Sequence, residues 1–342
     1  MLGEKMRQLR KKPVILIGIS AVCLAALGSF MLVFGTATLS VQTVLAVLMQ
    51  QLFGVESSEF TTAQQIIVWN IRWQRVALAM IVGSGLAVSG ACFQTMFKNP
   101  LADPFVLGVS SGAALGAAVS MITYHTELMI LFAFAGALLS LGLVWIFGRQ
   151  SIHIRSDQQL LLAGIACGAM LNAILSSLMA LNSEQIQMIV FWLMGSLSNY
   201  VDSLLPVFLL VIVGLIVAMV YARDLDVVAI GDEDAQFLGV DVKKVKLLLL
   251  VTATLMTGVC VSVSGIIGFI GLIIPHIVRK LAGPEHLLLL PLSAIYGAIF
   301  LLLADGLTRI VPVMSGIPVG VVTALFGSPF FLYVLHSASR RV

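Results

Sequence analysis

Charge is what this sequence has least of. Lys, Arg, Asp and Glu together make up 10% of the 342 residues, whereas an ordinary soluble domain contains about 25%. A water-soluble globule of this length must cover its surface with polar side chains, so the shortage excludes a soluble enzyme, a disordered chain and a nucleic-acid-binding protein. Apolar residues make up 60%, and the mean hydropathy is +1.08. We therefore expect lipid to surround most of the chain.

Cysteine and catalytic motifs are equally scarce. Each of the four cysteines lies within an apolar run and no C-x-x-C pair occurs, so we interpret them as small buried packing residues. They are Cys23, Cys92, Cys167 and Cys260. The chain contains no Walker A pattern and no H-E-x-x-H motif, and its histidines are scattered. The sequence therefore predicts no metal site, no cofactor and no catalytic centre.

Carboxylates are almost absent from the apolar runs. A proton- or sodium-driven transporter usually needs them there, and Asp305 is the one candidate. It precedes Arg309 by four residues, which favours a structural pair along one helix face near the outer surface. An ion-coupling role for Asp305 stays open as the alternative. With neither an ion site nor an ATPase motif, we expect the chain to take its energy from a partner.

Long apolar runs are abundant instead. A bilayer core about 30 Å thick needs about 20 apolar residues per helical crossing, and the runs predict an all-α integral membrane protein. The expected fold is a polytopic bundle of about ten transmembrane helices, forming a single permease domain over residues 1–342. The runs lie near residues 14–34, 75–97, 104–123, 128–148, 158–181, 202–221, 244–264, 267–281, 287–308 and 318–336.

Two of these runs need comment. The run at 14–34 follows a basic segment at 1–13, but it is longer than the apolar core of a signal peptide, so we expect a retained first span behind a cytoplasmic basic N-terminus. The run at 267–281 is short and contains Pro275 and His276, which makes a broken or partly inserted helix a further expectation there.

The basic residues predict the orientation. With both termini in the cytoplasm, 16 of the 19 Lys and Arg residues fall in inner loops, as membrane proteins prefer. Only Arg72, Arg75 and Arg309 fall outside. The inner sixteen are Lys5, Arg7, Arg10, Lys11, Lys12, Lys98, Arg149, Arg155, Arg223, Lys243, Lys244, Lys246, Arg279, Lys280, Arg340 and Arg341.

Small residues are concentrated inside the spans. Gly108, Gly112 and Gly116 are spaced four apart and therefore form a stripe on one helix face, which lets helix backbones approach closely. The second span carries further glycines, at positions 83, 85 and 90. This composition predicts a tightly packed bundle.

The longest charged inner segment, at 222–243, has the features of a docking element. Gly231 and Asp232 predict a helix start, because three acidic residues follow in the first turn, and Gly239 predicts its end. The pair Phe237–Leu238 is too short to bury itself in such a loop. We therefore interpret the segment as a short helix presented to a cytoplasmic partner; the alternative is a solvated loop.

Three stretches of this chain together resemble a known family. The resemblance is to the permease subunits of ABC importers for iron–siderophores, haem and vitamin B12, the type II importer class, and it covers residues from about 14 to 337. One departure is Arg-Trp-Gln-Arg at 72–75, where the family usually has Arg-x-Pro-Arg. The stretches are, first, 72–76, 82–90, Gln94, 99–104, 107–108 and 111–113; second, 231–239; and third, 265–279, 303–305, Arg309, 318–320, Thr323 and 327–330.

The resemblance implies a set of partners. A member of that family is a non-catalytic subunit in the cell membrane of a prokaryote, where it pairs with a second permease subunit, identical or paralogous. Two cytoplasmic ATPase subunits bind its inner face, and an extracytoplasmic binding protein delivers the cargo. We expect a ferric siderophore as cargo, since that group is the commonest in the family, with haem and vitamin B12 as alternatives.

The resemblance also assigns residues. Arg72, Arg75 and Arg309 match positions that receive acidic side chains from the binding protein, and Asn99 and Leu101 match the cytoplasmic gate. The alternative for the arginines is snorkelling to the interface and neutralising Asp305, and for the turn at 98–103 a plain connector. The segment that matches the coupling helix, which sits in a groove of the ATPase, comprises Asp232, Glu233, Asp234, Ala235, Gln236, Phe237, Leu238 and Gly239.

Overall fold

The protein is described by a computed structural model that covers residues 13–339 apart from positions 36, 38, 56–59, 149–155, 199–200 and 315. Within these residues every regular element is a helix, which confirms the prediction of an all-α protein. The basic segment 1–12 and the arginines at 149, 155, 340 and 341 lie outside the described residues.

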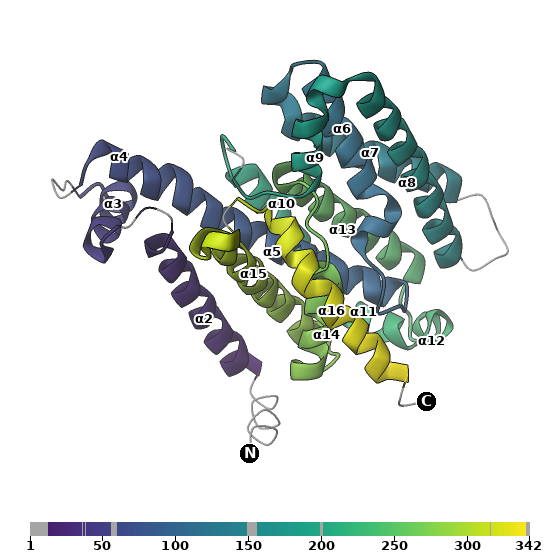
Figure 1. Ribbon diagram of the computed structural model, residues 1–342. Coiled ribbons are helices and arrows are strands. Elements are labelled where there is room, and N and C mark those ends of the chain that lie inside the picture. The colour runs from purple at the N-terminus through teal and green to yellow at the C-terminus, as the bar shows by residue number, and fades with distance from the viewer. Residues whose placement is uncertain are drawn as a thin grey trace.

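The helices follow one another with short connections (Figure 1). The first half contains α2 (Pro13–Val33), α3 (Val41–Phe53), α4 (Thr62–Gln65), a π-helix (Ile66–Trp73), α5 (Gln74–Met96), α6 (Val109–Ile122), α7 (Met129–Gly148) and α8 (Ser156–Leu181). The second half contains α9 (Ile186–Leu193), α10 (Leu205–Val220), α11 (Ala222–Ile230), α12 (Asp232–Phe237), α13 (Val242–Ser264), α14 (Ile270–Ala282), α15 (His286–Ile310) and α16 (Val319–Ser339).

Each of the ten apolar runs contains a helix, but the helices differ in length. Among the described residues, six helices are long and apolar enough to cross a bilayer, and α10 with α11, bent by 58°, would make a seventh. α3, α6 and the apolar stretch Val319–Val334 of α16 are shorter. A membrane bundle is therefore well supported, whereas the number of ten spans stays a prediction.

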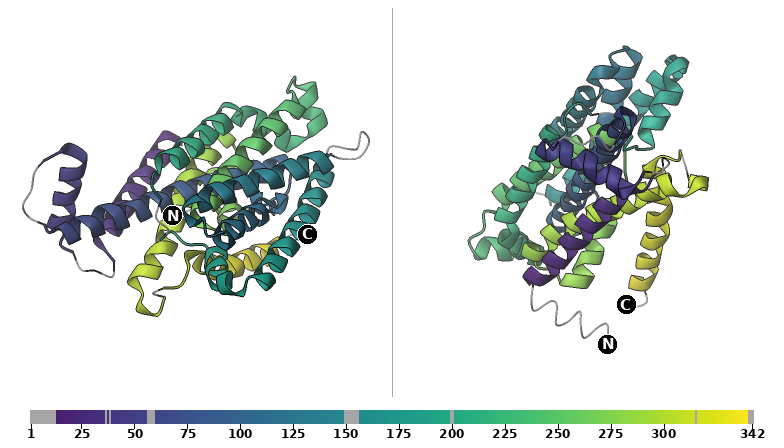
Figure 2. Two further views of the ribbon diagram at one scale, coloured as in Figure 1. Left: turned by 90° about the horizontal axis from the view of Figure 1, so that it is seen from above. Right: turned by 90° about the vertical axis from the view of Figure 1, so that its left-hand side faces the viewer.

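The apolar runs did not predict the first part of the helix that forms the second span. That span was expected to begin near residue 75, but the helix runs without a break from Thr62 to Met96. Its first part contains Gln64, Gln65 and Asn70, so no apolar run marks it. Together with α3, this part projects from one corner of the bundle (Figures 1 and 2).

α5 lies at the centre of the bundle and packs against α13, α14 and α15. In the most apolar window of the helix that contains it, 78% of the residues are buried, against 17% in α2. Cys92 and Cys260 are accordingly buried, and so is Cys167 on α8. Cys23 is exposed on the peripheral α2, so the expectation of a buried residue was wrong there.

The predicted glycine contacts are confirmed. A Cβ atom at Gly112 would collide with the backbone of Gly136 on α7, and one at Gly83 with the backbone of Gly297 on α15. Gly90 meets α14 in the same way, at Gly271. These crossings bring helix backbones into direct contact, as small-residue stripes do in membranes.

The run at 267–281 contains the expected short helix. α13 ends at Ser264, residues 265–269 form no helix, and Phe269 has a φ of 71° before α14 begins. With 13 residues, α14 is only about 20 Å long, too short to cross the bilayer core alone. The break lies before Pro275 and His276, which are both inside α14.

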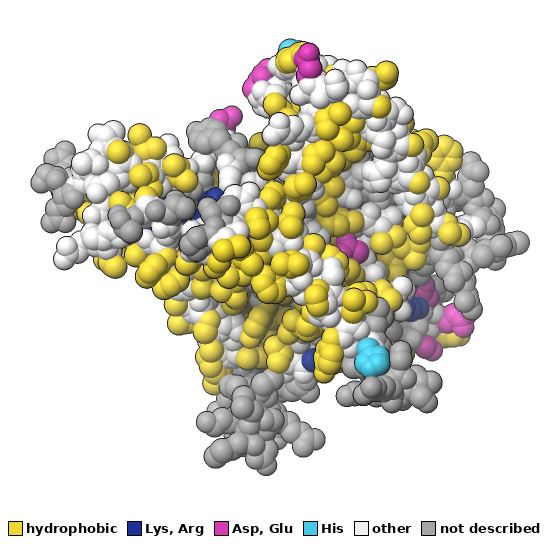
Figure 3. All heavy atoms as spheres, viewed as in Figure 1, with side chains coloured by type: hydrophobic (Ala, Val, Ile, Leu, Met, Phe, Trp, Pro, Cys, Tyr) yellow, Lys and Arg dark blue, Asp and Glu magenta, His cyan; other side chains and the backbone are white. Residues whose placement is uncertain are grey.

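The described ends of the chain, near residues 13 and 339, lie at the same end of the bundle as α12 (Figures 1 and 2). We call this end the inner end and the opposite one the outer end, after the predicted orientation, which stays a prediction. Between the two ends, the face seen in Figure 3 is mainly hydrophobic, with few charged side chains. Such a flank suits contact with lipid.

Candidate functional site

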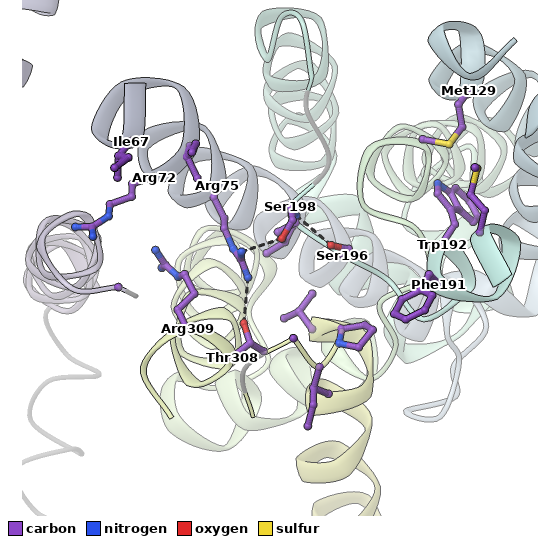
Figure 4. Close-up of a pocket in the computed structure, with 18 of the residues that line it drawn as sticks. Ile67, Arg72, Arg75, Met129, Phe191, Trp192, Ser196, Ser198, Thr308 and Arg309 are labelled. Atoms are coloured by element: carbon purple, nitrogen blue, oxygen red, sulfur yellow. Dashed lines mark hydrogen bonds between the residues drawn. The ribbon is translucent and has the colours of Figure 1, made fainter. Parts of the chain in front are cut away.

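Arg72 is held inside the outer end. The residue belongs to the π-helix, and only 4% of its surface is exposed. Its Nη1 donates to the carbonyl oxygens of Leu32 at 2.9 Å and Val33 at 2.6 Å, and its Nη2 donates to the carbonyl oxygen of Ala37. The guanidinium thus binds carbonyls at and just after the end of α2, and Figure 4 shows it pointing away from Arg75.

Arg75 connects three parts of the outer end. Its Nε donates to Asp305 Oδ1 at 2.6 Å. Figure 4 shows its two other bonds, from Nη1 to Ser198 Oγ at 2.8 Å and from Nη2 to Thr308 Oγ1 at 3.1 Å. The side chain is 20% exposed. α5, the segment at 196–198 and α15 therefore meet at one guanidinium.

Asp305 is shared by two arginines. The predicted pair with Arg309 is confirmed, with Nε and Oδ2 3.0 Å apart, and the carboxylate has no exposed surface. Arg309 also donates from Nη1 to the carbonyl oxygen of Met31 at 3.2 Å. The second partner, Arg75, was not predicted, because 230 positions separate it from Asp305 in the sequence.

The arginines border a cavity of about 810 Å³ at the outer end. Its wall combines the polar Ser196 and Ser198 with the apolar Met129, Phe191 and Trp192 (Figure 4). Beside the cavity, the non-helical segment at 195–196 joins the end of α13 to the start of α16: the Ser196 amide donates to the carbonyl of Ser264 at 2.7 Å, and the Gly320 amide to that of Gly195 at 3.4 Å. Irregular backbone at this depth is tolerated where it lines a cavity.

The predicted helix at the inner end is present. α12 covers Asp232–Phe237, and the chain leaves it through Gly239 with a φ of 87°. Ala235 is buried, whereas Phe237 is 90% exposed and Leu238 69% exposed. This exposure is what the predicted contact with a cytoplasmic partner requires of the pair.

Asp232 ties α12 to two other parts of the inner end. Its carboxylate lies 2.7 Å from Lys98 Nζ, in the turn after α5, and 2.6 Å from Lys246 Nζ, on α13. Partial burial raises the pKa of Asp232, but the two lysines outweigh it and hold the pKa below its usual range. The group is therefore ionised at neutral pH, and the pairs link α12 to the predicted gate turn and to α13.

The turn at 98–103 holds its own shape. Asn99 Oδ1 accepts the Leu101 amide at 2.9 Å, and Asp103 Oδ1 accepts the Phe105 amide at 2.9 Å. Burial raises the pKa of Asp103 to about 6, although the Phe105 amide opposes the shift.

Asn99 and Leu101 line a cavity of about 230 Å³ together with His276 on α14 and Phe330 and Phe331 on α16. The two predicted gate residues thus share one inner cavity.

Another polar network was missed at the sequence level. His286 at the start of α15 is 2% exposed, and its Nδ1 lies 2.6 Å from Asp226 Oδ1 on α11. Its Nε2 lies 2.7 Å from Thr95 Oγ1 on α5. Nothing in the sequence relates these three positions, so the network was not predicted from it. The network fixes α11, which leads into α12, to the central helix.

Comparison with known proteins gives a consistent result. The model of the FecCD transport family matches residues 21–337. The cobalamin import system permease protein BtuC of Halobacterium salinarum is 44% identical over 284 residues, covering 81% of this chain and 75% of the relative. The hemin transport system permease protein HmuU of Yersinia pestis is 40% identical over 278 residues, covering 78% and 83%.

Two further matches extend over nearly the whole chain. The Fe(3+)-citrate import system permease protein YfmE of Bacillus subtilis is 36% identical over 345 aligned residues, covering 99% of each chain. A solved metal-chelate type ABC transporter in an inward-facing conformation is 28% identical with a TM-score of 0.81, covering 94% of this chain and 99% of the other. The helix arrangement described above is thus shared with a solved transporter.

Proposed function

The chain belongs to the FecCD transport family, and from this premise we propose that it is the membrane-spanning permease subunit of an ATP-binding-cassette importer. The observation that carries the proposal is the exposed Phe237–Leu238 pair on a helix held at the inner end by Asp232. The chain itself performs no covalent chemistry, and a separate ATPase subunit hydrolyses ATP.

The proposed cargo is an iron-siderophore-type chelate, with haem or vitamin B12 as the alternatives. Relatives are named for cobalamin, hemin and ferric citrate, and a solved neighbour is of the metal-chelate type. The outer cavity is bordered by Arg72, Arg75 and Arg309, which favours a cargo with anionic groups such as carboxylates. An extracytoplasmic binding protein delivers the cargo to this cavity.

In this proposal the same arginines receive acidic side chains of the binding protein. Arg75 makes the direct contact, because at 20% its side chain is more exposed than those of its neighbours: that of Arg309 is 9% exposed, and Arg72 is 4% exposed as a whole residue. Arg72 and Arg309 contribute the surrounding positive charge. Pairs at such a rim mainly set the encounter rate and the orientation of the complex.

At the inner end, α12 is proposed to fit a groove of the ATPase and to transmit its closure. The Asp232–Lys98 pair, at 2.7 Å, provides a route from α12 to the turn with Asn99 and Leu101, the proposed gate. A second permease subunit, identical or paralogous, completes the pathway. The assembly lies in the plasma or inner membrane of a prokaryote, with about ten spans and both termini in the cytoplasm.

An ion-coupled transporter built on Asp305 is disfavoured by the geometry. Its carboxylate has no exposed surface and is paired with the guanidiniums of Arg75 and Arg309, so no side of it faces a path for a driving ion. A coupling carboxylate must bind and release its ion, so we retain the ATP-driven mechanism.

The proposal is tested by purifying the tagged chain with its co-expressed ATPase. Phe237→Asp should release the ATPase from the detergent-solubilised complex, because it places a charge where an apolar ring meets the groove. Gln236→Asp is the matched control: it adds the same charge at the neighbouring exposed position and leaves the ring in place. A stoichiometric ATPase in the Phe237→Asp sample would contradict the assignment of α12.

A further inference from the structure

The outer charge cluster, which comprises Arg72, Arg75, Arg309 and Asp305, contains more cations than anions. Arg72, Arg75 and Arg309 border one cavity, and among the described residues Asp305 is the one carboxylate that pairs with any of them, namely with Arg75 and Arg309. Arg75, the most exposed arginine, already donates to Asp305, Ser198 and Thr308. A carboxylate arriving from outside therefore meets a guanidinium that is already occupied.

The cluster can nevertheless release Arg75 without leaving Asp305 unpaired. Arg309 Nε lies 3.0 Å from Asp305 Oδ2, yet within the described structure neither these two atoms nor Arg309 Nη2 make a hydrogen bond. Arg309 therefore has N–H donors, and Asp305 an acceptor oxygen, that can form a further hydrogen bond. A small rotation of Arg309 would turn this ion pair into a hydrogen-bonded one. Removing the only partner of a buried charge is strongly destabilising, and Arg309 avoids that penalty.

We propose that Asp305 competes with the docking protein for Arg75, so that docking is an exchange of ion-pair partners in which Arg309 takes over Asp305. The inference rests on the proposed function, since it presumes a docking protein with an acidic side chain. It makes Asp305 a residue that regulates docking affinity and Arg309 the residue that makes the exchange possible.

The exchange has a structural consequence at the cavity. Arg75 holds Ser198 through Nη1 and Thr308 through Nη2, and both residues line the outer cavity. When Arg75 turns toward the docking protein, Ser198 and Thr308 lose the hydrogen bonds that join them through this one guanidinium. Docking thereby changes the hydrogen bonds in the wall of the cavity that receives the cargo.

The test measures the dissociation constant of the binding protein on the permease–ATPase complex in nanodiscs. Asp305→Asn keeps the shape of the side chain but removes the competing charge. We expect it to tighten docking by about tenfold, because a binding-competent Arg75 is then populated without an exchange. Arg75→Gln should weaken docking by about tenfold or more.

A double-mutant cycle separates this exchange from direct docking at Arg309. Arg309→Met should weaken docking, because Asp305 then depends on Arg75 alone. Combined with Asp305→Asn, the same substitution should bring the affinity back to or above that of the unmodified protein. If Arg309 instead binds the partner directly, the double variant stays as weak as Arg309→Met.

ATPase retention checks that each variant is assembled. If Asp305→Asn does not assemble, the double variant Ser198→Ala, Thr308→Val becomes the deciding variant. It removes two hydrogen bonds that hold Arg75 without removing a charge, and it should tighten docking by about threefold. Docking that is unchanged or weaker in the deciding variant, while Arg75→Gln weakens it, overturns the exchange alone. Docking that Arg75→Gln leaves unchanged removes the arginine cluster from the proposed function itself.

Discussion

At each end of the molecule one carboxylate lies between two cationic side chains, but the two clusters differ in burial. At the outer end, Asp305 lies between Arg75 and Arg309; at the inner end, Asp232 lies between Lys98 and Lys246. The exposed fraction of the carboxylate side chain is 0% in the first case and 35% in the second. In each cluster, one cation comes from the 72–98 region and the other follows the carboxylate in the sequence.

The burial of each cluster determines how readily its ion pairs can be broken. Breaking a buried pair leaves an uncompensated charge and is strongly destabilising, whereas a partly exposed pair is screened by water and contributes little. Arginine forks also fix geometry, while a lysine is a point charge on a flexible stem. The outer cluster therefore suits a defined exchange of partners, and the inner one suits a link that slides as α12 moves.

The largest effect should appear when each carboxylate is removed. Asp305→Ala leaves two guanidiniums without their counter-charge and should lower the free energy of unfolding by about 3–5 kcal/mol. Asp232→Ala removes partly exposed pairs and should lower it by about 1 kcal/mol. Denaturant titration of both variants in the same mixed micelles makes the comparison. Equal losses would show that the two clusters do not differ as described.

A smaller effect should appear in coupling when the inner link is cut. Lys98→Met removes the pair between α12 and the turn that holds the proposed gate, while Lys246 still holds Asp232. We expect ATPase binding and docking to stay unchanged and the cargo imported per ATP hydrolysed to fall by about threefold or more. Lys244→Met is the matched control, because Lys244 pairs with Asp241 beside it. An unaltered ratio in Lys98→Met would exclude this link from coupling.

Local patterns in the sequence predicted the parts of the fold that depend on neighbours along the chain. The apolar runs located the long helices, Gly231 and Gly239 bounded α12, and the spacing of Asp305 and Arg309 predicted their pair. The spaced glycines predicted the close helix crossings. Each of these features is set by helical periodicity or by a turn, and both can be read within a few residues.

The missed features depend on contacts between distant segments. Arg75 and Asp305 are 230 positions apart, and His286 and Asp226 are 60 apart. The polar start of the second span carries no apolar run, so its helix from Thr62 was not expected. Likewise, the sequence places Arg72 outside, but only the packing of α2 against the π-helix turns its guanidinium inward.

The most direct measurement is uptake of a radiolabelled iron chelate by vesicles containing the purified permease. With the ATPase subunits, the binding protein and ATP, the vesicles should accumulate the chelate against its gradient. Permease reconstituted alone should accumulate none, even with an imposed proton or sodium gradient. Accumulation by the permease alone would contradict the claim that this chain is a conduit driven by hydrolysis on another subunit.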